Sequence, residues 1–333
     1  MSRVASRART AVLATVVLPV LLVLPGCTTT VPVGPGSLAA GGVSLVGQTY
    51  RVGGKDFPEQ LVLCAMTIVV LRSLGATAED RCGIPDGAAT RAALEPTGRI
   101  DLYWEYTGIA TGGFLADARP PRGWPGDPAA LLAAVRAADA PRGVAWLAPT
   151  PFDDTYAIAA SRTEVDRLGV RTLSDWARRV QAGDPEATTC VEPEFAARPD
   201  GFPALLRAYG VTRPYDEPPA LTTVDHDVVY DSLPRAAPCS FGEVFSTDGR
   251  VRADQLVLLE DDRNHFPTYN AAPTVRREVL DRAPALAGVL DRLSARLTDA
   301  VIGDLNAQVL PGGRDPEEVG TAWLLAQGLV SRG

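Results

Sequence analysis

Short apolar segments alternate with helix-like segments along most of this 333-residue chain, and this order constrains the fold more than any other feature. The first kind has the pattern of strands and the second has the pattern of helices. The strand-like segments are 49–54, 99–106, 143–149, 155–161 and 187–195, and the main helix-like segments are 57–75, 86–98, 129–140 and 172–183. Such alternation predicts an α/β fold with largely parallel sheets.

The last part of the chain, from about Pro273, is expected to be almost entirely helical. Residues 283–297 and 315–330 place apolar side chains at amphipathic spacing. The length corresponds to roughly two domains of about 150 residues each. With 46% hydrophobic and 22% charged residues, the chain has enough apolar side chains to bury a sizeable core.

The N-terminal residues have the pattern of an export signal. Three arginines precede an apolar run over 11–26, which is short for a membrane-spanning helix and contains two prolines. The sequence LPGC that ends the run resembles the lipobox of bacterial lipoproteins. We expect 1–26 to be a signal peptide, Cys27 to carry a lipid anchor at the outer face of the cell membrane, and 27–45 to be a flexible tether. An uncleaved anchor and plain secretion are the alternatives.

Four further cysteines follow, and an even number in an exported protein indicates two disulfides. They form two groups along the sequence, Cys64 with Cys82 and Cys190 with Cys239. Of the three possible connectivities, pairing within each group is the simplest. Because the chain has no CxxC motif and only two histidines, we do not expect a metal site.

Charge and motif content exclude several classes of function. The formal net charge of −8 argues against nucleic acid as a partner. The chain has no GxSxG, HExxH, Walker A or strand-linked GxGxxG motif, so it is not expected to be an enzyme. His226, between two aspartates, is interpreted as part of a solvated loop because no second histidine lies at ligand spacing. No cofactor is implied.

The only lysine of the chain is Lys55, in the segment GGKDFPEQ, whereas all other basic residues are arginines. A lysine ammonium is a compact point charge, while an arginine guanidinium is a wide planar fork. A narrow pocket that receives one small anionic group would favour the ammonium. Chance survival on the surface is the alternative.

Five segments, taken in order, resemble one family, the substrate-binding proteins of ABC importers for glycine betaine, choline and carnitine. They are GGKDFPEQ, RIDLYWEYTG, EFAARPDGFPALLRAYG, EVFSTDGRV and HFPTYNAAPTVR. The resemblance covers essentially the whole chain after the tether. It implies a two-lobed periplasmic-binding-protein fold of type II, in which each lobe is a mainly parallel sheet flanked by helices. Lobe 1 would comprise 46–152 and 265–333, and lobe 2 would comprise 153–264.

The chemistry of such ligands explains why these residue types are present. A trimethylammonium group donates no hydrogen bond, and aromatic faces attract its diffuse charge. A carboxylate at the other end of a betaine requires cationic or other hydrogen-bond donors. The resemblance implies an aromatic box, one backbone carbonyl beside the methyl groups, and a carboxylate clamp. The box would be formed by Tyr106, Tyr156, Phe245 and Tyr269. The carbonyl would be that of Asp154, and the clamp would consist of Lys55 and Arg198.

Two positions depart from the family pattern. Many relatives have tyrosine where this chain has Phe245, so a ring face is kept but a hydroxyl is lost. Relatives often have a threonine at the position of Ile109, and its hydroxyl donates a hydrogen bond to the ligand carboxylate. Isoleucine cannot donate, so either Lys55 and Arg198 bind the carboxylate alone or the preferred ligand differs from glycine betaine. In the strand around Tyr106, period-2 alternation puts Trp104 on the same face as Tyr106. Trp104 is assigned either to the core or to the pocket wall.

The implied function is capture of a quaternary-ammonium solute outside the membrane, for delivery to an ABC permease by a monomeric protein. With Lys55 and Arg198 both facing the cleft, glycine betaine or a related carboxylated betaine would be preferred over choline. The alternative is a lipoprotein sensor or scavenger of the same fold that binds choline or a bulkier molecule. A secreted enzyme on an unrelated α/β fold is the remaining rival.

Overall fold

The computed structural model describes residues 32–333 except 86, 96–97, 116–126, 198–200 and 215–220. Two residues with predicted roles, Cys27 and Arg198, lie outside this part of the chain. Within the described residues, no helix combines the length and the apolar character that crossing a membrane requires.

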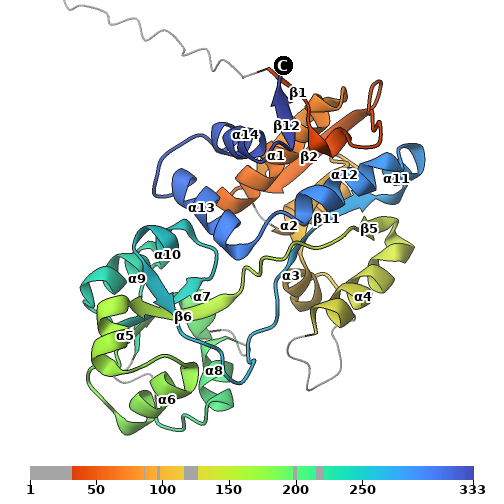
Figure 1. Ribbon diagram of the computed structural model, residues 1–333. Helices are drawn as coiled ribbons and strands as arrows, with labels where there is room; N and C mark the ends of the chain where they lie inside the picture. The colour runs from red at the N-terminus through yellow and green to blue at the C-terminus, as the bar shows by residue number, and fades with distance from the viewer. Residues whose placement is uncertain (1–31, 86, 96–97, 116–126, 198–200, 215–220) are drawn as a thin grey trace, which may run out of the picture. The chain divides into compact units, whose positions relative to one another are not determined.

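Two five-stranded sheets form the framework of the protein (Figure 1). The first sheet has the strand order β3-β2-β4-β11-β5, and we call it lobe 1 together with the helices packed on it. Its strands are β2 (Thr49–Lys55), β3 (Thr77–Ile84), β4 (Leu102–Tyr106), β5 (Val144–Trp146) and β11 (Ala271–Arg276). The second sheet, the framework of lobe 2, has the order β10-β6-β9-β7-β8. Its strands are β6 (Tyr156–Ser161), β7 (Thr189–Val191), β8 (Leu221–Thr223), β9 (Phe241–Phe245) and β10 (Leu256–Leu258).

The chain crosses between the sheets twice, once between β5 and β6 and once between β10 and β11. The lobe boundaries expected at residues 153 and 264 fall within these two connections and stay a prediction. Lobe 1 is therefore built from two separate stretches of chain, whereas the strands of lobe 2 come from one continuous stretch.

Each sheet is mainly parallel, as expected, because four of its five strands run in one direction and a single strand runs in the other. In lobe 1, β2 is parallel to β3 and β4, but β11 is antiparallel to both β4 and β5. In lobe 2, β7 is parallel to β8 and β9, but β6 is antiparallel to β9 and β10. The reason is the double crossing: β11 starts beside Tyr106, where β4 ends, so it must run in the opposite direction.

Helices cover the sheets, and the four expected at 57–75, 86–98, 129–140 and 172–183 are all present, as α1, α2, α4 and α6. Their bounds are α1 (Pro58–Ser73), α2 (Gly87–Leu94), α3 (Thr107–Gly112), α4 (Pro128–Asp139), α5 (Arg162–Leu168), α6 (Leu173–Ala182), α7 (Pro193–Ala197), α8 (Phe202–Ala208), α9 (His226–Ser232), α10 (Gly249–Ala253), α11 (Arg277–Arg282), α12 (Ala285–Ser294), α13 (Asp299–Val309) and α14 (Pro316–Ala326). The helical C-terminal part is confirmed, apart from the short strand β12 (Val330–Arg332), which pairs with β1 (Val33–Pro35), as Figure 1 shows.

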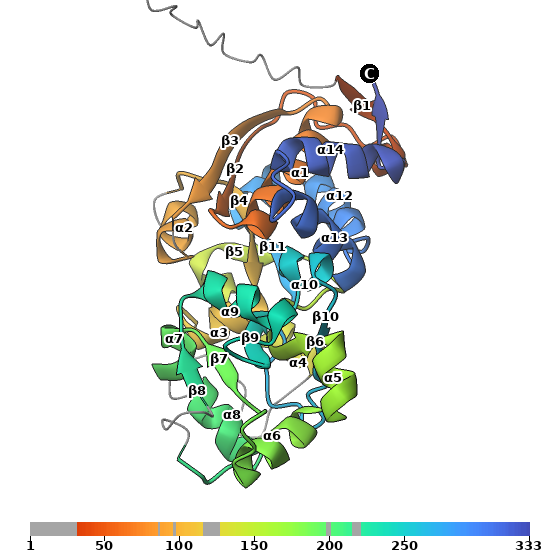
Figure 2. The same ribbon diagram turned by 90° about the vertical axis from the view of Figure 1, so that its left-hand side faces the viewer.

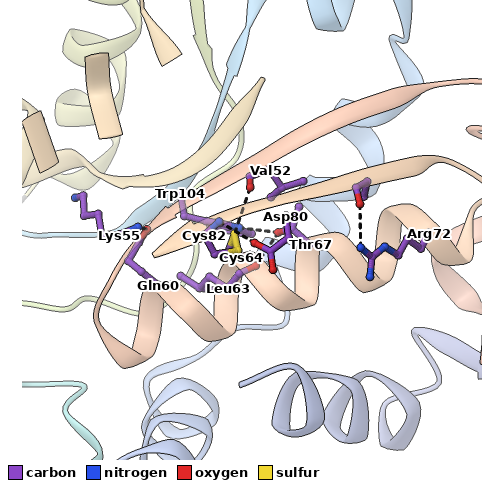
Figure 3. Close-up of a disulfide and its surroundings, with 11 residues drawn as sticks. Val52, Lys55, Gln60, Leu63, Cys64, Thr67, Arg72, Asp80, Cys82 and Trp104 are labelled. Atoms are coloured by element: carbon purple, nitrogen blue, oxygen red, sulfur yellow. Dashed lines mark hydrogen bonds between the residues drawn. A yellow bond between two sulfur atoms is a disulfide. The ribbon is translucent and has the colours of Figure 1, made fainter. Parts of the chain in front are cut away.

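Helix α1 is buried on nearly all sides because β2 and β3 cover one side and α14 covers another. Pro58 occupies its first turn, where a missing backbone N–H costs no helical hydrogen bond. The Cys64–Cys82 disulfide joins α1 to β3 (Figure 3). The second disulfide joins Cys190 to Cys239 in lobe 2, so both bridges follow the simplest pairing.

The strand β4 separates two apolar clusters of lobe 1. Trp104 and Tyr106 belong to the cluster that includes α1, while Tyr103 belongs to the opposite one, as period-2 alternation predicts. The Trp104 indole donates a hydrogen bond of 2.9 Å to the Thr67 hydroxyl on α1. Trp104 is 1% exposed and does not line the cavity described below, so it is a core residue.

The lobes contact each other where α10 of lobe 2 packs on α13 of lobe 1 (Figure 2). This packing depends on the missing side chain of Gly249, because a Cβ atom there would lie 2.2 Å from the carbonyl oxygen of Leu310. The contact brings the C-terminal end of α13 beside the loop that follows β9.

Candidate functional site

Residues from both lobes line a cavity of about 440 Å³. Seven of the eight predicted ligand-binding residues lie on it: Lys55, Tyr106, Ile109, Asp154, Tyr156, Phe245 and Tyr269. The eighth, Arg198, is outside the described residues. Ile109 is 42% exposed, which places it at the rim, whereas the predicted box residues Tyr106 and Tyr269 are buried.

Strand ends bring the four box rings together. Tyr106 is the last residue of β4, Phe245 is the last residue of β9, and Tyr156 is the first residue of β6. Tyr269 precedes β11, which starts opposite Tyr106. Because the edges of the two sheets that carry these ends face the same cavity, four residues from distant parts of the sequence meet there.

The rings of Tyr156, Phe245 and Tyr269 form an aromatic corner. The Tyr156 and Tyr269 rings are nearly perpendicular, with an interplanar angle of 81° and centroids 6.3 Å apart. The Phe245 ring is tilted by 45° from Tyr156 with centroids 4.9 Å apart. All three residues line the cavity, and aromatic ring faces attract a cation.

The position of Tyr269 depends on Gly108 in the first turn of α3. A Cβ atom at residue 108 would lie 2.6 Å from Cδ1 of the Tyr269 ring, so only glycine allows this approach. The backbone N–H of Tyr269 also donates a hydrogen bond of 2.5 Å to the Asp153 carboxylate. Two independent contacts therefore hold this wall of the aromatic corner.

Lys55 lines the cavity, but its charge is compensated inside the protein. Its Nζ atom lies 2.6 Å from Oε1 of Glu105, a carboxylate with 0% exposure. The same ammonium lies 5.0 Å from the centroid of the Tyr106 ring. Lys55 thus neutralises a buried acid and already interacts with one ring of the predicted box, and its role toward a ligand carboxylate stays a prediction.

Glu59 is a lining residue that the sequence reasoning missed. It lies in the first turn of α1, where the helix N-terminus favours a negative charge, and it is 3% exposed. Its Oε1 accepts a hydrogen bond of 2.7 Å from the Tyr106 hydroxyl, and its Oε2 accepts one of 3.0 Å from Asn306 on α13. Burial raises the pKa of Glu59.

Thr247, also missed, links this acid to lobe 2. Its hydroxyl lies 2.7 Å from both Glu59 and Asp154, and its carbonyl oxygen accepts a hydrogen bond of 2.8 Å from Asn306. Burial raises the pKa of Asp154 well above the usual range of an aspartate, and the neighbouring Glu59 raises it further. The only sequence signal for Glu59 and Thr247 was their place inside GGKDFPEQ and EVFSTDGRV.

The interpretation of His226 as part of a solvated loop is wrong. His226 is the first residue of α9 and lines the cavity, with its ring centroid 5.4 Å from that of Phe245. Burial lowers its pKa, but the carboxylates of Asp248 and Glu192, 3.9 Å and 3.6 Å from its ring nitrogens, outweigh this and raise it to about 9. Arg250, a further lining residue, pairs with Asp248 at 2.8 Å.

Comparison with known proteins gives the chain a family context. A family model described as the substrate binding domain of ABC-type glycine betaine transport system matches residues 48–326. A glycine-betaine-binding protein of Pseudomonas aeruginosa is 34% identical over 292 residues, which cover 86% of this chain and 90% of that protein.

Two solved structures have the same architecture. Apo YehZ from Escherichia coli matches with a TM-score of 0.72 at 26% identity, over 84% of this chain and 99% of that one. The crystal structure of a glycine betaine/carnitine/choline ABC transporter matches with a TM-score of 0.74 at 19% identity, over 85% and 98% of the two chains. The two-lobed α/β fold expected from the sequence is therefore confirmed.

Proposed function

Because this chain belongs to the family of substrate-binding domains of ABC-type glycine betaine transport systems and binds a solute for an ABC importer, we propose that its solute is a small quaternary-ammonium compound held in the cavity between the lobes. The observation that carries this proposal is the aromatic corner of Tyr156, Phe245 and Tyr269 beside the carboxyl groups of Glu59 and Asp154. Ring faces and acids both attract a cation, and the rings also suit its methyl groups.

The charges around the cavity suggest where the cation lies. Lys55 occupies the neighbourhood of the Tyr106 ring and would repel a second cation there. The trimethylammonium group therefore belongs at the aromatic corner, away from Lys55. Since Lys55 is neutralised by Glu105, the acids of the cavity favour a net cation such as choline more than the sequence alone indicated. Arg198 would supply the opposite preference for a carboxylated betaine.

The cellular setting is part of the same proposal. Substrate-binding proteins of ABC importers act outside the cytoplasm, and the two disulfides fit an oxidising compartment. We propose that Cys27 carries lipid, that residues 27–45 tether the folded part, and that a monomer presents its closed lobes to a permease. Mass spectrometry of membrane-extracted protein tests the anchor, and an unmodified Cys27 would exclude it.

Calorimetric titration of the purified protein tests the ligand class. Choline and glycine betaine are compared with 3,3-dimethyl-1-butanol, which has the shape of choline but no charge. The proposal expects at least one quaternary ammonium to bind more tightly than the uncharged compound by about tenfold or more, because each cation–π contact in a desolvated site contributes up to about 2 kcal/mol. Equal affinity for the charged and uncharged compounds would refute it.

Variants at Tyr156 test the site itself. Tyr156→Leu keeps an apolar side chain but removes the ring face, so cation affinity should fall by about tenfold. Tyr156→Phe is the matched control, because it keeps the ring and should bind nearly as the unaltered protein does. If both variants bind equally well, the cation lies elsewhere.

A further inference from the structure

The carboxyl groups of Glu59 and Asp154 share one hydroxyl group at the wall of the cavity. Thr247 Oγ1 lies 2.7 Å from Glu59 Oε2 and 2.7 Å from Asp154 Oδ1. A threonine hydroxyl carries one proton, so it can donate to only one of these two oxygens. The second contact is a hydrogen bond only if the other carboxyl group is protonated and donates to Thr247. This geometry therefore requires one proton on the pair of acids.

The surrounding hydrogen bonds assign that proton to Asp154. Glu59 accepts hydrogen bonds from Tyr106 and Asn306 in addition to Thr247, and three donors stabilise an ionised carboxylate. Among the described residues, the side chain of Asp154 has a hydrogen bond with Thr247 alone. Both burial and the charge of Glu59 raise the pKa of Asp154, which is the direction that favours its protonated form.

No cation in the described part of the chain pairs with either acid. The cations that line the cavity are Lys55, His226 and Arg250, and each has carboxylate neighbours outside the pair. Two further carboxylates, Asp153 and Asp248, face the pair and raise the pKa of Asp154. The proton therefore stands where a counter-cation would be expected.

We propose that capture of a quaternary ammonium expels this proton, so that the cavity exchanges one positive charge for another. The proposal rests on the proposed function and adds a role for Glu59, Asp154 and Thr247 in selecting cations. The acids line the same cavity as the aromatic corner, so a ligand cation lies beside them and favours their ionised forms. The protonated protein and the cation yield the complex and one proton, which is released to the solvent.

This exchange has a direct consequence for the dependence of affinity on pH. Protons compete with the ligand as long as the pair is protonated in the free protein. The affinity for a cation therefore rises with pH, by up to about tenfold per pH unit, and becomes constant once the free pair has lost its proton. An uncharged ligand gains nothing from ionised acids, so its affinity does not rise in this way.

Calorimetry in two buffers with different ionisation enthalpies, phosphate and Tris, counts the released protons at pH 7. Choline and glycine betaine are titrated separately, and 3,3-dimethyl-1-butanol is the uncharged control. We expect close to one proton to leave when a quaternary ammonium binds and none when the uncharged compound binds. Binding of a quaternary ammonium without proton release would overturn this proposal while leaving the proposed function intact. Failure of both quaternary ammonium compounds to bind would refute the proposed function itself.

Substitutions locate the source of the proton. Asp154→Asn removes the carboxyl group that carries the proton and should abolish the release, whereas Thr247→Ser keeps the bridging hydroxyl and should preserve it. Glu59→Gln should abolish the release and weaken cation binding at pH 8. Glu243 is the control, because burial raises its pKa to about 7 but it does not line the cavity. If Glu243→Gln stops the release, or if Asp154→Asn leaves it unchanged, the assignment to this pair is wrong.

Discussion

Replacing Lys55 by methionine tests whether the only lysine of the chain serves the folded structure or the ligand. The Lys55–Glu105 pair is separated by 2.6 Å, and both side chains are buried. In Lys55→Met, the Glu105 carboxylate keeps the Tyr103 hydroxyl and the Tyr106 backbone N–H as donors but loses its counter-charge. Removing one partner of a buried ion pair costs about 3–5 kcal/mol, because the other charge remains uncompensated.

A double-mutant cycle measures this cost in the ligand-free protein. Urea unfolding is compared for Lys55→Met, Glu105→Gln and the double variant. A loss of 3–5 kcal/mol corresponds to a melting temperature lower by roughly 6–20 °C. The double variant should recover most of the loss, because glutamine leaves no charge to compensate. Arg252→Met is the control: Arg252 forms an ion pair of the same 2.6 Å length with Asp304, but on the surface, so its loss should matter little.

The outcome for ligand binding decides between the two roles. If Lys55 mainly neutralises Glu105, the affinity for choline should be unchanged or higher in the double variant, since a nearby positive charge is gone. If Lys55→Met leaves the unfolding free energy unchanged and instead weakens only the binding of glycine betaine, the structural reasoning is refuted. In that case Lys55 is the carboxylate-binding residue that the sequence indicated.

Three further outcomes are expected. Gly108→Ala should displace the Tyr269 ring, which packs on residue 108, and weaken cation binding by about tenfold or more. In the control Gly112→Ala, in the same helix, the added Cβ meets no atom within 4 Å, so this variant should bind normally. Equal cation affinities of the two variants in calorimetry would contradict this. Cys190→Ser should lower the unfolding free energy by about 4 kcal/mol, because the Cys190–Cys239 bridge closes a loop of 49 residues. Cys64→Ser should lower it by about 3 kcal/mol, because the Cys64–Cys82 bridge closes a loop of 18 residues. A larger loss for Cys64→Ser in denaturant titrations would reject this ranking. The pKa of His226 is raised to about 9, which contributes up to about 3 kcal/mol of stability that is present below pH 6.5 and lost as the pH rises through 9. His226→Gln should therefore be less stable than the unaltered protein at pH 6 and equally stable at pH 10. If the unfolding free energies of the two proteins change with pH in parallel, the histidine is not charged.

The sequence predicted several elements of the fold because their signals are local. The apolar run of α1 and the alternation in β4 are properties of neighbouring residues, so this helix and this strand follow from them, whereas the choice between core and pocket wall for Trp104 does not. The direction of β11 could not be predicted in this way. It depends on the return of the chain from lobe 2, which no local pattern records.

The same distinction applies to the site. The four predicted box residues line the cavity, and they were named because the resemblance supplied their motifs; their role toward a ligand stays a prediction. The partner of Lys55 was missed although Glu105 lies in a quoted motif, because their pairing requires the parallel register of β2 and β4, in which Val52 is opposite Leu102. Glu59 is separated in sequence from Thr247 by 188 residues and from Asn306 by 247, so no spacing rule could connect them.

The divided construction of lobe 1 has a consequence for the order of folding. Strand β4 is complete long before β11, its partner, is synthesised, and Tyr103 is separated from Thr274 by 171 residues. Until then, one edge of β4 has unpaired backbone groups that could pair with another chain. In lobe 2, by contrast, the five strands follow one another along the chain without a strand of the other lobe between them. Lobe 2 is therefore able to fold while lobe 1 is still unfinished. A chain that ends before β11 should therefore show a protease-resistant lobe 2 and an aggregation-prone lobe 1.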